Sequence, residues 1–231
     1  MPLIEPEKIK LSGKLVKTIC LETLRGKSLG RTLMNYCLSE FELTGDILDL
    51  GSGSEPASYH RFLKFREPYT LTRSDFYRTG ANLIKLNLEE PFQVEPASFD
   101  YVMCFNVLEH VYNFKNVIKE SYRILKKKGL FIGSTPFLQI FHPDPQDYFR
   151  YSHEALRKMF EEENYVSHRI IYLGFGPFSS SIAQWAGLLP GVLRPWPIIK
   201  CLFLDTIFNN FSKPSKMRYP LGYVFAFQKP E

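Results

Sequence analysis

Two segments of the sequence concentrate residues whose types and spacing could do chemistry. The first is DLGSGSEP at 49–56, where an apolar run ends in a carboxylate and a glycine-rich turn. Glycines let a backbone approach a ligand closely, and an acid buried at a strand end needs hydrogen-bond donors or a cation around it. Two glycines alone are a weak motif, and Pro56 stands where a nicotinamide-type fingerprint would place a further glycine.

The second segment, FLQIFHPDPQDYFRYS at 137–152, gathers imidazole, carboxylate, phenol and guanidinium groups in one short loop. His142 is its best base because an imidazole titrates near neutral pH. Asp144 or Asp147 could orient His142 or bind the acceptor, and Arg150 could clamp a carboxylate or a phosphate. His142, Asp147 and Arg150 are the predicted catalytic residues. The alternative is that Asp147 and Arg150 form an internal salt bridge and that the tyrosines belong to the core.

The elements that must position these segments alternate along the middle of the chain. Apolar runs bounded by glycine, proline or polar residues predict strands at 45–51, 69–74, 82–86, 99–105, 130–134, 166–173 and 221–228. Apolar residues at helical spacing, with end signals, predict helices at 14–26, 28–41, 56–65, 116–127 and 153–163, with Gly129 as a C-cap and Ser152 as an N-cap. Such alternation is typical of an α/β fold with a doubly wound sheet.

Read together, these segments resemble a known family, the class I S-adenosylmethionine-dependent methyltransferases. The similarity is to the type 11-like group with a Leu-Glu-His signature. It rests on Asp75 and on four segments in order: ILDLGSGS at 47–54, LIKLNLEEPF at 83–92, SFDYVMCFNVLEHV at 98–111 and ESYRILKKKGLFIGSTP at 120–136. Any single piece is weak, but their order and spacing are specific over about residues 45–165 and the closing strand.

The resemblance implies an enzyme that transfers a methyl group from S-adenosylmethionine to oxygen or nitrogen of a small-molecule, or a lipid- or sugar-linked, acceptor. The implied cofactor contacts are Asp49, Gly51, Ser52, Gly53, Asp75, Asn87, Leu88 and Asn106. Asp75 matches the acid that accepts from the ribose hydroxyls, Asn87 falls beside the adenine, and Asn106 lies near the methionine moiety. The implied fold is a Rossmann-like, seven-stranded, mostly parallel sheet with an antiparallel last strand.

Departures from the family pattern keep two other classes open. Glu55 replaces the third glycine of the first motif, so the turn must take a different path. That would suit a non-catalytic, methyltransferase-fold interaction subunit. A nicotinamide-dependent enzyme is the other class, and the missing glycine argues against it. We assign Glu109 and His110 of the Leu-Glu-His signature to structural roles and predict no metal site. The cysteines form no CxxC pair, which fits a reducing, cytoplasmic setting.

The last quarter of the chain carries the whole net charge of +5 and is also the most apolar. We expect one domain: N-terminal helices (1–44), a cofactor-binding core (45–175), an apolar cap insertion (176–218) and a closing strand (219–231). Short helices at 182–189 and 197–211 would form the cap as a lid over the acceptor. A homodimer interface, or contact with anionic lipid at the inner face of a membrane, is the alternative. No nucleic-acid partner is expected, because no binding module accompanies the charge.

Overall fold

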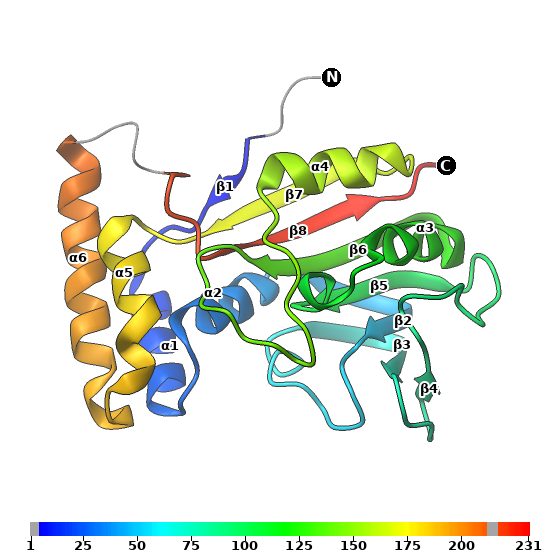
Figure 1. The fold of residues 1–231 in the computed structure, drawn as a ribbon, viewed down its shortest axis with the longest axis horizontal. Coiled ribbons are helices and arrows are strands. Elements are labelled where there is room, and N and C mark those ends of the chain that lie inside the picture. The colour runs from blue at the N-terminus through cyan, green and yellow to red at the C-terminus, as the bar shows by residue number, and fades with distance from the viewer. Residues whose placement is uncertain (1–4, 212–216) are drawn as a thin grey trace.

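The computed structural model describes residues 5–211 and 217–231. Within them, helices cover both faces of an eight-stranded sheet with the order β1-β7-β8-β6-β5-β2-β3-β4 (Figure 1). Strand β8 is antiparallel to both of its neighbours, and the other pairs are parallel. The predicted Rossmann-like sheet with an antiparallel last strand is therefore confirmed, with one strand more than expected.

The strands are β1 (Glu7–Lys8), β2 (Glu42–Leu50), β3 (Lys64–Asp75), β4 (Leu83–Lys85), β5 (Phe99–Phe105), β6 (Leu125–Pro136), β7 (Val166–Leu173) and β8 (Gly222–Gln228). The helices are α1 (Gly13–Leu24), α2 (Leu29–Leu38), α3 (Phe114–Ile124), α4 (His153–Glu162), α5 (Pro177–Trp185) and α6 (Pro195–Phe211), with single 3-10 turns η1 (Leu108–His110), η2 (Ala186–Leu188) and η3 (Gly191–Leu193). The additional strand, β1, pairs with β7 and is too short to show a period in the sequence.

Alternating side chains build one core on each face of the sheet. In β8, Tyr223, Phe225 and Phe227 face the core under α3 and α4, and Phe227 stacks on Phe160 of α4 with 4.2 Å between ring centroids. Val224, between them, faces the core under α1, α2, α5 and α6. The period of two in a strand therefore sends its aromatic residues to one side and its smaller ones to the other.

The helix predicted at 56–65 is wrong. Residues 51–63 form turns, and β3 begins at Lys64. The backbone N–H of Ala57 donates to the imidazole of His60 over 3.1 Å, and such local side-chain acceptors compete with helical hydrogen bonds. Tyr59 and Leu63 still reach the core, although no helix carries them.

The predicted C-cap at Gly129 is also wrong, because α3 ends at Ile124 and the chain continues directly into β6. A Cβ on Gly129 would lie 2.9 Å from the carbonyl oxygen of Lys126, so glycine serves a close backbone approach inside the strand. The N-cap at Ser152 is confirmed, since its hydroxyl accepts the backbone N–H of Ala155.

Helix α6 packs on α5 and on α1 at one end of the sheet (Figure 1). Asp205 of α6 is fully buried and caps α5 from a distance, accepting the backbone N–H groups of Phe178 (2.9 Å) and Ser179 (2.8 Å). A Cβ on Gly176 would lie 2.5 Å from Asp205 Oδ1, so glycine is needed there. In the described part of the chain, no helix combines the length and the apolarity that crossing a membrane requires.

Candidate active site

Four neighbouring parallel strands, β6, β5, β2 and β3, end at one edge of the sheet. Gly51 and Gly53 follow β2, Asp75 ends β3, and Asn106 follows β5. Loops at the carboxyl edge of a doubly wound sheet form its ligand crevice. The fold therefore brings the predicted cofactor residues to one edge, and the 137–152 loop leaves β6 beside them.

The glycine-rich turn is tied to the end of β3. The backbone N–H of Gly51 donates to Ser74 Oγ (2.9 Å), and that of Gly53 donates to the carbonyl of Ser74 (3.2 Å). Both glycines have positive φ, 64° and 75°. A Cβ on Gly51 would lie 2.9 Å from Val107 Cγ2, whereas a Cβ on Gly53 would meet only Asp75 Oδ2, at 3.8 Å. Gly51 is therefore required for packing, and Gly53 leaves open space beside Asp75.

Asp49, near the end of β2, holds the glycine-rich turn in place. Its fully buried carboxylate accepts from the Tyr59 hydroxyl (2.9 Å to Oδ2) and from His60 Nε2 (2.6 Å). His60 Nδ1 accepts the backbone N–H of Ala57, so the proton of the neutral ring is on Nε2. Burial raises the pKa of Asp49, and the contacts with His60 and Tyr59 oppose that shift. Ser52 Oγ donates to the Asp49 carbonyl (3.2 Å). Asp49 thus binds the turn itself rather than presenting an open carboxylate.

Asp75 keeps one carboxylate oxygen without a partner among the described residues. Oδ1 accepts the backbone N–H groups of Tyr77 (2.7 Å) and Arg78 (2.9 Å), while Oδ2 is the atom that a Cβ on Gly53 would meet. Arg78 also donates to Ser54 Oγ (2.8 Å) and so holds the turn against the end of β3. A carboxylate held in this way can accept hydrogen bonds from ligand hydroxyl groups at Oδ2.

The remaining predicted cofactor residues lie farther along the same edge. Asn87 Oδ1 accepts the backbone N–H of Glu89 (3.0 Å), and its amide N–H groups make no hydrogen bond within the described residues. Leu88 packs half-buried on the core under α3 and α4. Asn106 has a φ of 54° and accepts from Ser134 Oγ (2.8 Å). Asn87 is therefore oriented to donate, and Asn106 is fixed at the end of β5.

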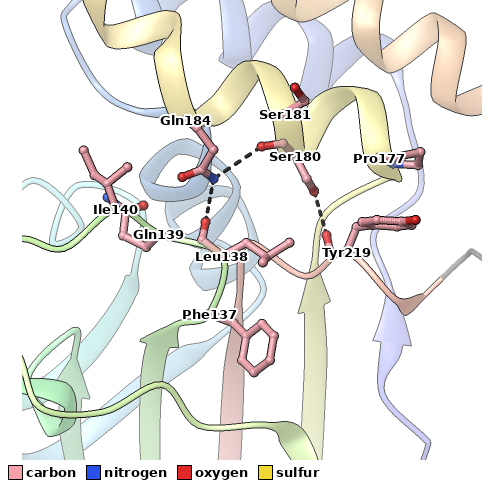
Figure 2. Close-up of a pocket in the computed structure, with 9 residues that line it drawn as sticks. All are labelled: Phe137, Leu138, Gln139, Ile140, Pro177, Ser180, Ser181, Gln184 and Tyr219. Carbon is pink, nitrogen blue, oxygen red and sulfur yellow. Dashed lines mark hydrogen bonds between the residues drawn. The ribbon is translucent and has the colours of Figure 1, made fainter.

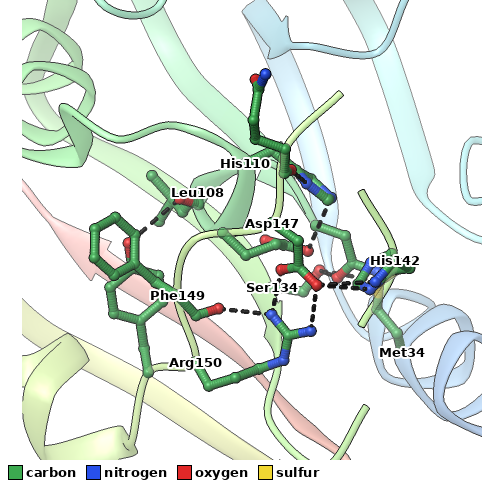
Figure 3. A network of polar contacts seen from close by, with 12 residues as sticks. Met34, Leu108, His110, Ser134, His142, Asp147, Phe149 and Arg150 are labelled. Atoms are coloured by element: carbon green, nitrogen blue, oxygen red, sulfur yellow. Dashed lines mark hydrogen bonds and ion pairs between the residues drawn. The ribbon is translucent and has the colours of Figure 1, made fainter. Parts of the chain in front are cut away.

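On the acceptor side, Asp147 and Arg150 contact each other (Figure 3). Arg150 Nη2 donates to Asp147 Oδ2 over 2.6 Å, and Nη1 contacts Oδ1. The Arg150 guanidinium holds the pKa of Asp147 well below its usual range. Asp147 Oδ2 also accepts the backbone N–H of His142 (3.0 Å). This is the internal salt bridge that the sequence analysis gave as the alternative to a catalytic role. Through the bond from the backbone N–H of His142, Asp147 also positions His142.

The acceptor loop is docked on the Leu-Glu-His turn, η1. The carbonyl of Glu109 accepts the backbone N–H of Tyr148 (2.8 Å), and His110 Nδ1 lies 2.5 Å from the carbonyl oxygen of Gln146. The rings of His110 and His142 consequently meet edge to face, with 5.2 Å between centroids. The Leu-Glu-His signature thus fixes the loop that carries His142.

Two charged side chains at this edge were not among the predicted site residues. Glu109 is fully buried, and neither carboxylate oxygen has a hydrogen-bond partner among the described residues. This burial raises the pKa of Glu109 to about 8. Arg31 of α2 lies 5.4 Å from the Tyr59 ring centroid and, with Asn106 and His142, lines a polar hollow of about 210 Å³. The Leu-Glu-His motif could have identified Glu109 as a site residue. A single arginine on a helix gives no such indication, so Arg31 could not be identified from the sequence.

A larger, mostly apolar hollow of about 500 Å³ lies between α5 and the start of the acceptor loop (Figure 2). Gln184 Nε2 donates to the carbonyl of Leu138 (2.8 Å), and Ser180 Oγ donates to that of Tyr219 (2.7 Å), which fixes its walls. Gln139 lines both hollows. The apolar hollow therefore adjoins the polar one.

Comparison with known proteins relates part of this chain to a described protein family. Residues 48–133 match the family model described as a methyltransferase domain, and they contain the glycine-rich turn, Asp75 and the Leu-Glu-His turn. This part of the chain, less than half of its length, is similar to the methyltransferase domain. A ubiquinone biosynthesis O-methyltransferase from Photobacterium profundum is 35% identical over 72 residues, which are 30% of this chain and 31% of that protein. The match thus spans about a third of that relative's length.

Solved structures confirm the fold of the methyltransferase domain. A chain from the complex of the Haloferax volcanii Trm112 methyltransferase activator with a methyltransferase has a TM-score of 0.54 at 12% identity, over 96% of this chain and all of that one. The [4+2]-cyclase SpnF has a TM-score of 0.55 at 10% identity, over 94% and 93%. Haemonchus contortus phosphoethanolamine N-methyltransferase 2, in complex with S-adenosyl-L-methionine, has a TM-score of 0.53 at 14% identity, over 86% and 52%.

At such low sequence identity, these structures show a shared fold and no shared function. One of them is a cyclase, so this fold also supports reactions other than methyl transfer. The predicted fold is confirmed, and residues 48–133 carry the similarity to the predicted methyltransferase family, whose methyl donor is S-adenosylmethionine.

Proposed function

We propose that the protein transfers a methyl group from S-adenosylmethionine to an oxygen or nitrogen atom of a small acceptor with an apolar part. One observation carries the proposal. The donor residues at Gly53 and Asp75, the polar hollow and the apolar hollow follow one another along a single edge of the sheet. The relatives' names support both acceptor atoms, since one is an O-methyltransferase and another an N-methyltransferase.

The donor residues fit S-adenosylmethionine. Asp75 Oδ2 is available to accept the ribose hydroxyls, and the open space at Gly53 admits a ligand beside it. When bound, the donor supplies a methyl carbon on a sulfonium; a nucleophile attacks that carbon in line, and the carbon–sulfur electron pair stays on sulfur. The asparagine at 106 and the turn at 51–53 would hold the methionine end at the polar hollow.

The acceptor's reacting atom would occupy the polar hollow beside His142. His142 Nδ1 lies 3.1 Å from the carbonyl oxygen of Ile140, which places the ring proton on Nδ1 and leaves the lone pair on Nε2. The Nε2 lone pair can take a proton from the acceptor directly. It can also bind a cation that lowers the pKa of the acceptor's hydroxyl or amine group. We assign Asp147 and Arg150 to positioning this imidazole, because their charged groups are engaged with each other.

The acceptor's apolar part would occupy the hollow at α5, and the outer face of the cap suggests where such a molecule is found. Leu188 is 86% exposed and Trp196 is 73% exposed, and Lys200 of α6 is exposed as well. Arg25, which follows α1, is exposed and pairs with Glu22. Lys213 and Lys216, which the sequence places in this region, lie outside the described residues. We infer that this face rests on anionic lipid, with the protein cytoplasmic and peripheral.

The lipid contact is tested by sedimentation with phosphatidylglycerol vesicles and with phosphatidylcholine vesicles. Trp196→Ser should reduce binding to the former, whereas His168→Ala, on the far end of β7, should not. Elution of the wild type as a dimer, with no vesicle binding, would instead assign the face to a homodimer interface.

The methyl-transfer proposal is tested with S-adenosylmethionine carrying a labelled methyl group and solvent extracts of cells as acceptor pools. Label should pass into the hydrophobic extract with the wild type, fall strongly with Asp75→Ala, and persist with Asp46→Ala, a carboxylate in the middle of β2 that pairs with Lys126. Label that appears only in water-soluble products would refute the apolar acceptor.

A second candidate function is a non-catalytic interaction subunit. The observation that favours it is the closed contact of Asp49 with Tyr59 and His60, together with the missing helix after the glycine-rich turn. Such a subunit would show no turnover with any acceptor. The exposed side chain of Glu55 argues for the enzyme, because it points to solvent rather than filling the space at Gly53.

A further inference from the structure

Three potential metal ligands converge beside the polar hollow. Glu109, His110 and His142 each offer one ligand atom, and these atoms lie within 4.8 Å of one another; the structure describes no other such group in residues 5–211 and 217–231. Glu109 Oε1 is 3.8 Å from His110 Nε2. Glu109 and His110 come from η1, and His142 comes from the loop docked upon it. Figure 3 labels His110 and His142.

The Glu109 carboxylate is the unusual member. It is fully buried, and both of its oxygens are without a hydrogen-bond partner in the described chain. A buried carboxylate without side-chain donors is costly, so such a group either keeps its proton or is compensated by a cation. Two guanidinium groups act on it through space, those of Arg31 and Arg150, but neither donates to it, and Arg150 is already paired with Asp147.

Both imidazoles are oriented as metal-binding histidines are. His110 Nδ1 faces the carbonyl oxygen of Gln146, and His142 Nδ1 faces that of Ile140. A carbonyl can only accept, so Nδ1 of each ring carries the proton and Nε2 has the lone pair. Backbone carbonyls on the second nitrogen are the usual outer partners of histidine ligands, because they fix the tautomer and the ring orientation.

We propose that Glu109, His110 and His142 bind one divalent first-row transition-metal ion. Two imidazoles and one carboxylate favour Mn²⁺, Fe²⁺, Co²⁺ or Zn²⁺ over Mg²⁺ or Ca²⁺, which prefer oxygen ligands. Tetrahedral ligand bonds of about 2.1 Å place the ligand atoms about 3.4 Å apart, so atoms that now lie up to 4.8 Å apart must close by up to about 1.4 Å. The side chain of His142 is 37% exposed and has room to rotate, while its backbone N–H stays bonded to Asp147. Three protein ligands would leave a coordination position for a further ligand, and His142 also lines the polar hollow.

The consequence for catalysis rests on the proposed function. An acceptor hydroxyl that binds the ion at an open position loses its proton more readily, and the proton passes to water. The resulting oxygen anion forms the bond to the methyl carbon as the carbon–sulfur bond breaks. The Nε2 lone pair of His142 then holds the ion rather than the proton. This assignment favours oxygen over nitrogen as the atom methylated.

The test is titration of chelator-treated protein with Co²⁺ alone, without methyl donor or acceptor, followed by visible absorption. We expect saturation at one ion per chain. His142→Ala and Glu109→Gln should each weaken binding by at least about tenfold, a loss that changes even in outer partners cause. His168→Ala, an exposed histidine at the far end of β7, should bind as the wild type does. Circular dichroism of each variant establishes that it is folded.

Absence of saturable Co²⁺ binding, or equal affinity in the wild type and both ligand variants, would overturn the proposal. Paramagnetic shifts of the His110 and His142 ring protons give an independent readout if one variant does not fold. Binding of S-adenosylmethionine is measured separately on the same preparation. A protein that binds Co²⁺ but not S-adenosylmethionine would refute the proposed function and support the metal site. A protein that binds S-adenosylmethionine but not Co²⁺ would refute the metal site and leave the proposed function supported.

Discussion

Tyr59→Phe should destabilise the protein by removing a single oxygen atom. The Tyr59 hydroxyl is buried and donates to the Asp49 carboxylate, with 2.9 Å and 3.0 Å to its two oxygens. Hydrogen bonds to charged groups contribute about 1.5–3 kcal/mol, and little cavity forms because the ring stays. The ring contacts with Phe105 and Arg31 are retained. For a chain of this size the loss corresponds to a fall in Tm of roughly 3–12 °C.

The assay is urea unfolding of the wild type, Tyr59→Phe and a matched variant, Tyr101→Phe. The Tyr101 hydroxyl is half-buried and makes no hydrogen bond with a described residue, so its loss should change the free energy of unfolding by less than about 0.5 kcal/mol. Affinity for S-adenosylmethionine should also fall in Tyr59→Phe, because Asp49 organises the turn that carries Gly53. Equal stability of the two variants would refute the role given to Asp49.

Three further predictions concern packing and the turn. Gly53→Ala should weaken binding of S-adenosylmethionine several-fold in calorimetry, because its positive φ adds strain of about 1–2 kcal/mol and its methyl group faces Asp75, while Gly187→Ala, with open space around it, should not. Asp205→Ala should lower the free energy of unfolding by about 1–3 kcal/mol, measured in urea, by removing the cap of α5. Ile198→Ala should lower it by about 2–5 kcal/mol, whereas Leu188→Ala, at an exposed position, should change it by less than about 0.5 kcal/mol; similar losses in the two would contradict the packing of α6.

Much of the sheet was predictable because its strands are continuous apolar runs with clear ends. The bounds predicted for β5 and β7 agree with the structure. The segment at 56–65 was not predictable in the same way, because the ring of His60 is held by Asp49 of β2, a contact that the local sequence does not signal, and only then accepts the backbone N–H of Ala57. The short β1 exists only through its pairing with β7, which no local pattern signals.

The candidate site divides along similar lines. A glycine-rich turn and strand-end acids are local patterns, so the donor residues could be proposed from the sequence. Whether Asp147 pairs with Arg150 or with a ligand depends on distances inside one loop, and both interpretations remained open until the geometry was known. The unpartnered carboxylate of Glu109 and the approach of Arg31 from α2 result from packing between distant segments, and composition or spacing cannot reveal them.

Calorimetric titration with S-adenosylmethionine and S-adenosylhomocysteine, with NAD as the control ligand, tests the central claim most directly. We expect one site per chain for the first two ligands and none for NAD. Asp75→Ala should weaken that binding by at least about tenfold, or about 1.4 kcal/mol, without loss of the folded state. Folded wild-type protein that binds neither methyl ligand, or that binds them equally well without the Asp75 carboxylate, would contradict the account.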